Sequence, residues 1–133
     1  MKITRQADYA TRAILYLARF NRGERVSTSQ VAKEQKIPQS FLAKIISQLS
    51  VAGLLHTSRG ARGGISLARE PEQITLLEVI EAIDGPIRGL VPGENNPSSH
   101  PVNKKLEVIC NQAAEQLRKH LGKIKIQEIA ARD

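Results

Sequence analysis

Residues 27–69 read STSQVAKEQKIPQSFLAKIISQLSVAGLLHTSRGARGGISLAR, and this stretch decides the fold. Between residues 38 and 52, apolar residues recur at three- and four-residue spacing, which places them on one face of a helix. They are Phe41, Leu42, Ile45, Ile46 and Leu49. Pro38 suits the first turn of a helix, and Gly53 suits the left-handed position after the last turn. The sequence therefore predicts a helix over residues 38–52.

A shorter helix is predicted just upstream, over Thr28 to Gln35. Ser27 and Gln30 have the spacing of a capping box, and the two valines at positions 26 and 31 can form the hydrophobic staple that sets the entry angle. Only about three residues separate the two predicted helices. Such a short connection is typical of a helix-turn-helix motif, in which the second helix is the reader.

A basic, glycine-rich hairpin follows the second helix. Residues 54–57 and 65–67 are short strand-like runs, and the glycines between them permit tight turns and close approach to another surface. Arg59 and Arg62 lie beside these glycines. An arginine at the tip of a thin ribbon can enter a minor groove or contact phosphates. We predict a mainly α-helical protein with a small β-hairpin, a winged helix-turn-helix domain.

The polar side chains of this region suit nucleic acid. Gln can pair with adenine, Lys with guanine or phosphate, and Ser with several base edges. An ordinary solvated helix face would have a similar composition, and the neighbouring basic hairpin is what favours DNA. The predicted DNA-contacting residues are Thr28, Ser29, Gln39, Ser40, Phe41, Lys44, Gln48, Arg59, Gly60, Arg62 and Gly63.

Charge is distributed unevenly along the chain. Residues 1–69 hold 12 Lys or Arg against 3 Asp or Glu, whereas residues 70–133 hold 8 against 10. Clustered cations are needed for phosphate contacts. The asymmetry therefore favours a nucleic-acid-binding half joined to an assembly or sensing half.

The rest of the chain divides around this motif. A first helix is predicted within residues 1–20, capped by Thr4, and a short helix after Thr75 closes the domain at residue 85. Residues 86–102 are rich in Pro, Gly, Asn and Ser and are predicted to form a loop. Residues 103–133 complete the chain, and their last part, 123–130, is compatible with either a strand or a helix.

Residues 103–121 resume helical periodicity, with an apolar stripe that requires a partner. The stripe contains Leu106, Ile109, Cys110, Ala113, Leu117 and Leu121. The first five are candidates for the interface with that partner. If the partner is a second copy of the chain, changes in the crossing of the two helices, or in the loop before them, would alter the separation of the reading helices.

Four motifs in order resemble the Rrf-two type of bacterial transcriptional repressors, the group containing IscR, NsrR and CymR. These motifs are TRQADYA at 4–10, IPQSFL at 37–42, AGLL at 52–55 and SRGARGG at 58–64. The resemblance implies a homodimer on a palindromic operator, with the helix at 39–52 in the major groove and Arg59 in the minor groove. It also implies that the long helix forms the dimer interface.

Many members of that group hold an iron-sulfur cluster through three loop cysteines and a fourth ligand. The only cysteine of this chain is Cys110, which lies in the predicted long helix, so no cofactor is expected. One alternative is a cluster with the atypical ligands Asp8, His100 and Cys110. Another is a redox switch at the Cys110 thiol, although an inert, buried cysteine is the favoured interpretation.

Other classes of protein fit the sequence less well. No phosphate loop, metal motif or nucleophile-base spacing indicates an enzyme. A winged-helix adaptor that binds another protein and no DNA is the main rival. The sequence contains no apolar run near the ~20 residues that span a bilayer, and no signal-peptide pattern. We therefore expect a cytoplasmic protein whose partners are double-stranded DNA and a second copy of the chain, with no membrane contact.

Overall fold

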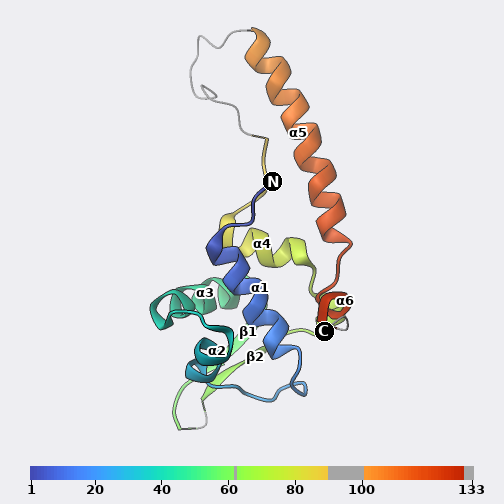
Figure 1. Ribbon diagram of the computed structural model, residues 1–133. Coiled ribbons are helices and arrows are strands. Elements are labelled where there is room, and N and C mark those ends of the chain that lie inside the picture. The colour runs from blue at the N-terminus through green and yellow to red at the C-terminus, as the bar shows by residue number, and fades with distance from the viewer. Residues whose placement is uncertain (62, 90–100, 131–133) are drawn as a thin grey trace.

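The computed structural model describes residues 1–61, 63–89 and 101–130. The described chain forms a cluster of short helices with one hairpin, from which a single long helix projects (Figure 1). The elements are α1 (Arg5–Leu17), α2 (Thr28–Gln35), α3 (Gln39–Val51), β1 (Leu55–Ser58), β2 (Gly64–Leu67), the short 3-10 helix η1 (Pro71–Gln73), α4 (Leu76–Asp84), α5 (Pro101–Gly122) and α6 (Ile126–Ala130). The mainly helical fold with a small hairpin is thus confirmed.

Local capping explains where the first helices begin. The Thr4 side chain accepts a hydrogen bond from the backbone N–H of Ala7, and the Ser27 side chain accepts one from the N–H of Gln30. The Ser27 capping box is only half formed, because the Gln30 amide donates instead to the Tyr16 hydroxyl at 2.9 Å. Hydroxyl caps therefore start α1 and α2 as predicted.

Helix α1 lies at the centre of the cluster and packs against α2, α3 and α4. Its inner face carries small residues that are completely buried, namely Ala7, Ala10 and Ala13. Small side chains let neighbouring helices approach closely, so larger aliphatic residues from the surrounding elements fill the space. The largest fully buried of these are Leu42, Ile45, Leu49, Leu54, Ile65, Ile74, Ile126, Val31 and Val79.

The two strands pair antiparallel, with Leu55 opposite Leu67 and Ser58 opposite Gly64. The other edge of β2 is also paired, because Val26 and Ile65 exchange two backbone hydrogen bonds of 2.9 and 2.8 Å. Val26 immediately precedes the cap of α2. The hairpin is therefore joined directly to the helix-turn-helix motif.

The C-terminal region corrects two expectations. Helix α5 begins at Pro101, inside the stretch 86–102 that was predicted to be a loop, because proline is well accommodated in a first helical turn. Leu121, predicted for the exposed stripe, is buried against its own chain. Of the two forms that the sequence left open for segment 123–130, the structure has the helix, α6, preceded by one isolated bridge between Lys125 and Thr75.

Helix α6 returns to the core of the N-terminal cluster through the fully buried Ile126. It packs against α1 and η1. The residues after the long helix are thus part of the same hydrophobic core as the helix-turn-helix motif. Within the described residues, no helix combines the length and the hydropathy needed to cross a bilayer.

Candidate nucleic-acid interface

The turn between α2 and α3 fixes the angle of the reading helix. Lys36 adopts a left-handed conformation with φ of 54°, and the N–H of the buried Ile37 donates to the carbonyl of Ala32 at 2.9 Å. Pro38 is the N-cap residue of α3, one position earlier than a first-turn proline. The apolar face of α3 is then buried through Leu42, Ile45, Ile46 and Leu49.

The opposite face of α3 is open to solvent. Gln39, Ser40 and Lys44 are all exposed on it, as the sequence predicts. Phe41 was placed in the apolar stripe, but its side chain is 43% exposed at the edge of that stripe. Its ring lies 6.3 Å from the ring of Tyr9, measured between centroids. Phe41 is therefore an aromatic group on the candidate DNA face instead of a core residue.

Gln48 faces a different direction from these residues. Its amide donates to the backbone carbonyl of Ile83 in α4 at 3.5 Å, and its side chain is half-buried. The structure therefore does not group Gln48 with Gln39, Ser40 and Lys44. A contact from α3 to α4 across 35 residues of sequence has no local signal.

The hairpin tip depends on close backbone approach. The N–H of Gly63 donates to the carbonyl of Gly60 at 2.9 Å, and a Cβ atom at Gly63 would lie 2.5 Å from the Ser58 carbonyl oxygen. Only glycine fits such a contact without displacing the chain. Arg59 stands exposed beside this turn. Arg62, the second predicted arginine, lies outside the described residues.

A groove joins the hairpin to the start of α2. Thr28 lines it together with Ser58, Gly60 and Gly63. Hydroxyls and glycine backbone groups provide hydrogen-bond donors without bulk, which suits a phosphate backbone. Ser29 is exposed in the first turn of α2. The structure therefore brings three of the predicted residues into one groove, although α2 and the hairpin are far apart in sequence.

One exposed side of α5 is apolar, in contrast to the polar groove beside the hairpin. Val102, Leu106 and Ile109 are 51%, 44% and 60% exposed, and Ala113 continues the row. Spacings of four and three residues place them on one side of the helix. We call this row the α5 seam.

The other two residues predicted for the dimer interface, Cys110 and Leu117, are half-buried. Together with Met1 and Ile87 they line a hollow between α5 and the segment that follows α4. That segment is fixed where the N–H of Gly89 donates to the Asn111 side chain at 3.2 Å. Cys110 is therefore less buried than expected for an inert core cysteine.

The side chains that could serve as ligands do not fit an iron-sulfur cluster. Such clusters are held mainly by cysteine thiolates, and the chain has one cysteine. The Asp8 carboxylate is paired with the Arg12 guanidinium at 2.9 Å, and His100 lies outside the described residues. Among the residues described, no three His, Cys, Asp or Glu side chains gather as a metal site requires.

Ionic contacts that sequence reasoning missed tie α4 to its neighbours. Arg118 of α5 donates to Glu81 at 2.9 and 3.2 Å, and Glu81 also accepts from the N–H of Ile87. The hydrogen bond from Arg118 outweighs partial burial and holds the pKa of Glu81 below its ordinary value. The Asp8–Arg12 and Glu115–Arg118 pairs did have a usable sequence signal, because their four- and three-residue spacings are typical of ion pairs on a helix.

Comparison with known sequences places the chain in a family. The Rrf2 family model, described as "Iron-dependent Transcriptional regulator", matches residues 3–132. The regulator NsrR of Bacillus licheniformis is 34% identical over 110 residues, which cover 83% of this chain and 74% of NsrR. A relative from Aquifex aeolicus is 47% identical over 73 residues. The chain spans only about half of that relative, since the match covers 50% of it.

Solved structures agree with this assignment. CymR of B. subtilis, named as a global cysteine regulator, superposes with a TM-score of 0.77 at 27% identity, covering 100% of this chain and 98% of CymR. IscR of T. potens gives 0.74 at 25% identity, covering 97% and 85%. Both matches extend over α5 as well as the winged domain. The chain therefore belongs to the Rrf2 family of winged-helix transcriptional regulators.

Proposed function

We propose that this protein is a transcriptional repressor that binds a palindromic operator as a homodimer. Helix α3 lies in the major groove, where Gln39, Ser40 and Lys44 contact bases or phosphates. Arg59 enters the adjacent minor groove, and the groove at Thr28 receives the DNA backbone. The observation that carries the proposal is the exposed polar face of α3 next to a glycine-tipped basic hairpin.

The homodimer is supported by the α5 seam. Exposed apolar rows of this kind are typical of helix pairing, and a dimer would present two copies of α3 to one duplex. Reading helices must then lie about one helical turn apart, roughly 34 Å. Control acts through the stretch predicted as a loop, residues 86–102, and through α5, because a change in helix crossing alters that distance.

The direct test is selection of a 40-base-pair random duplex library on the purified protein, followed by fluorescence anisotropy with the enriched duplex. We expect an inverted repeat and an affinity that falls by orders of magnitude between about 50 and 200 mM salt.

Arg59→Ala should weaken binding about tenfold and relax preference at A/T steps. Lys105→Ala is the matched control, because Lys105 is an exposed cation on α5. Absence of enrichment and of duplex binding at 50 mM salt would favour the adaptor instead.

We propose further that the repressor works without an iron-sulfur cluster, since the donor set contains a single cysteine per chain. The test is an ultraviolet-visible spectrum of protein purified without oxygen, with iron and sulfide assayed on the same sample. We expect a colourless, iron-free dimer that binds duplex DNA. Stoichiometric iron and sulfide would contradict this and would make Asp8, His100 and Cys110 the next substitutions.

A further inference from the structure

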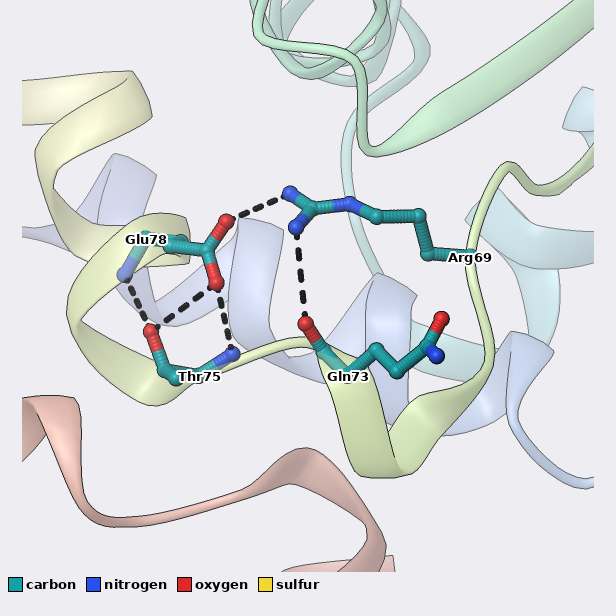
Figure 2. A network of polar contacts seen from close by, with 4 residues as sticks. All are labelled: Arg69, Gln73, Thr75 and Glu78. Atoms are coloured by element: carbon teal, nitrogen blue, oxygen red, sulfur yellow. Dashed lines mark hydrogen bonds and ion pairs between the residues drawn. The ribbon is translucent and has the colours of Figure 1, made fainter.

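Arg69 lies at the base of the hairpin, two residues after β2 ends. The backbone there is fixed to the hairpin, because the N–H of Ala68 donates to the carbonyl of Leu54 at 3.0 Å. The Arg69 guanidinium turns away from the strands and donates to the Glu78 carboxylate at 2.5 Å and to the Gln73 carbonyl at 3.4 Å (Figure 2). One side chain therefore connects the hairpin to the start of α4.

Glu78 is held firmly at its end of this link. Its carboxylate accepts from the N–H and the hydroxyl of Thr75, both at 3.2 Å, and the Thr75 hydroxyl accepts from the N–H of Glu78 at 3.1 Å. This is the complete capping box of α4 (Figure 2). Because three hydrogen bonds fix Thr75 and Glu78 together, Arg69 follows any movement of the first turn of α4.

The same turn is paired with the C-terminal segment. The N–H of Leu76 donates to the carbonyl of Ile124, and the N–H of Ile126 donates to the carbonyl of Ile74, both at 2.9 Å. Ile124 lies two residues after the end of α5. Residues 73–78 are therefore bonded to the hairpin base through Arg69, and two backbone hydrogen bonds join them to residues 124–126, just after the long helix.

We propose that Arg69 is a positioning residue that makes the placement of the wing on DNA depend on the docking of the long helix. A two-stranded hairpin has little stability of its own, so its anchors set its direction. These anchors include the Val26–Ile65 pair, the burial of Leu55 and Leu67 in the core, and the Arg69–Glu78 contact. A shift of residues 124–126 would move the Arg69 anchor and hence Arg59. This inference rests on the proposed function.

The experiment uses Arg69→Gln, Glu78→Gln, the double variant and the charge exchange Arg69→Glu/Glu78→Arg. Gln at position 78 can still complete a capping box, so this change removes the ionic contact and leaves the cap of α4. Each protein is titrated with two duplexes: the enriched operator and the same operator with its minor-groove A/T steps replaced by G/C. Circular dichroism confirms helix content.

We expect each single variant to lose most of the discrimination between the two duplexes and about tenfold in affinity for the first. The double variant should lose no more, and the charge exchange should restore part of the discrimination. Arg22→Gln is the matched control, because Arg22 makes a similar exposed ion pair with Glu70 at 2.6 Å that does not reach α4. It should leave discrimination unchanged.

Two outcomes separate this inference from the proposed function. If Arg59→Ala abolishes discrimination and Arg69→Gln preserves it, Arg69 does not position the wing. If Arg59→Ala also has no effect, the wing itself does not read the minor groove and the proposed function fails.

The dependence on α5 is tested with Ile126→Val, which trims a fully buried side chain in the segment that pairs with α4. It should reduce discrimination in the wild-type background and have no further effect when combined with Arg69→Gln. Additive effects of the two changes would overturn the connection between α5 and the wing.

Discussion

Helices α3 and α5 carry the same kind of amphipathic pattern with different consequences. Leu49 on the apolar face of α3 is completely buried by its own chain, whereas Ile109 on the α5 seam is 60% exposed. Burial of an apolar face against the same chain stabilises a domain, and an uncovered face is typical of an interaction surface. The spacing of apolar residues therefore predicts which side of a helix packs. It does not predict whether that side packs against the same chain or against a partner.

The strongest test of this comparison is Leu49→Ala in α3. The change leaves a cavity in the core next to α1, and we expect a loss of about 2–5 kcal/mol in the free energy of unfolding. Urea denaturation followed by circular dichroism measures it. The loss should be the same at low and high protein concentration, because the missing contacts lie within one chain. A loss below 1 kcal/mol would mean that α3 is not part of the core described here.

The α5 seam should respond in the opposite way. Leu106→Glu combined with Ile109→Glu puts two charges into the expected dimer interface. We expect a rise of at least about 100-fold in the dimer dissociation constant, which corresponds to about 2.7 kcal/mol. Sedimentation equilibrium measures the constant, and helix content should be unchanged.

Val108→Glu is the matched control for the seam. Val108 is 56% exposed on the same helix, but its position falls off the row formed by Val102, Leu106 and Ile109. This variant should stay dimeric. Equal dissociation in both variants would place the interface on more than one side of α5, and a monomeric wild type would end the dimer proposal.

Local rules predicted the ends of several helices well. The start of α2, the capping hydroxyls of Thr4 and Thr75, and the left-handed Gly53 with φ of 78° all follow from neighbouring residues. Predicted strand ends differ from the observed ones by about one residue, because pairing partners and not propensity decide the last ladder bond. Such features depend on a few consecutive residues, and the sequence contains all of them.

Contacts between distant segments could not be predicted in the same way. Gln48 contacts Ile83, Leu121 is covered by its own chain, and Arg69 reaches Glu78 after the chain has turned through η1. Each depends on how separate helices approach one another. Of the candidate DNA face, the sequence predicted the residue types and the exposed side of α3, but not that Thr28 shares a groove with the hairpin.

A smaller effect is expected at the capping box that begins α4. Thr75→Ala removes the hydroxyl that caps α4 and supports Glu78, and we expect a loss of about 1 kcal/mol in the free energy of unfolding. Thermal denaturation measures it. Ser27→Ala removes the half-formed cap of α2 and should cost less. If Ser27→Ala is the more costly change, the Glu78 half of the α4 capping box contributes nothing.

The smallest expected effect is a pH dependence at the covered side of α5. The Arg118 contact lowers the pKa of Glu81 in the folded protein, so its stabilising contribution is complete above the ordinary carboxyl value of about 4.3. That contribution is lost as pH falls through the lower folded pKa. We expect this contribution to be less than about 1 kcal/mol, because Arg118 is partly exposed.

Urea unfolding between pH 3 and 7 measures how the free energy of unfolding changes with pH. This dependence should be shallower for Glu81→Gln than for wild type. Glu115→Gln is the control, because Glu115 makes only the longer 3.6 Å pair with Arg118, and it should change the dependence less. An unchanged slope for Glu81→Gln would mean that the open side of α5, and not its covered side, governs how the helix responds to acid.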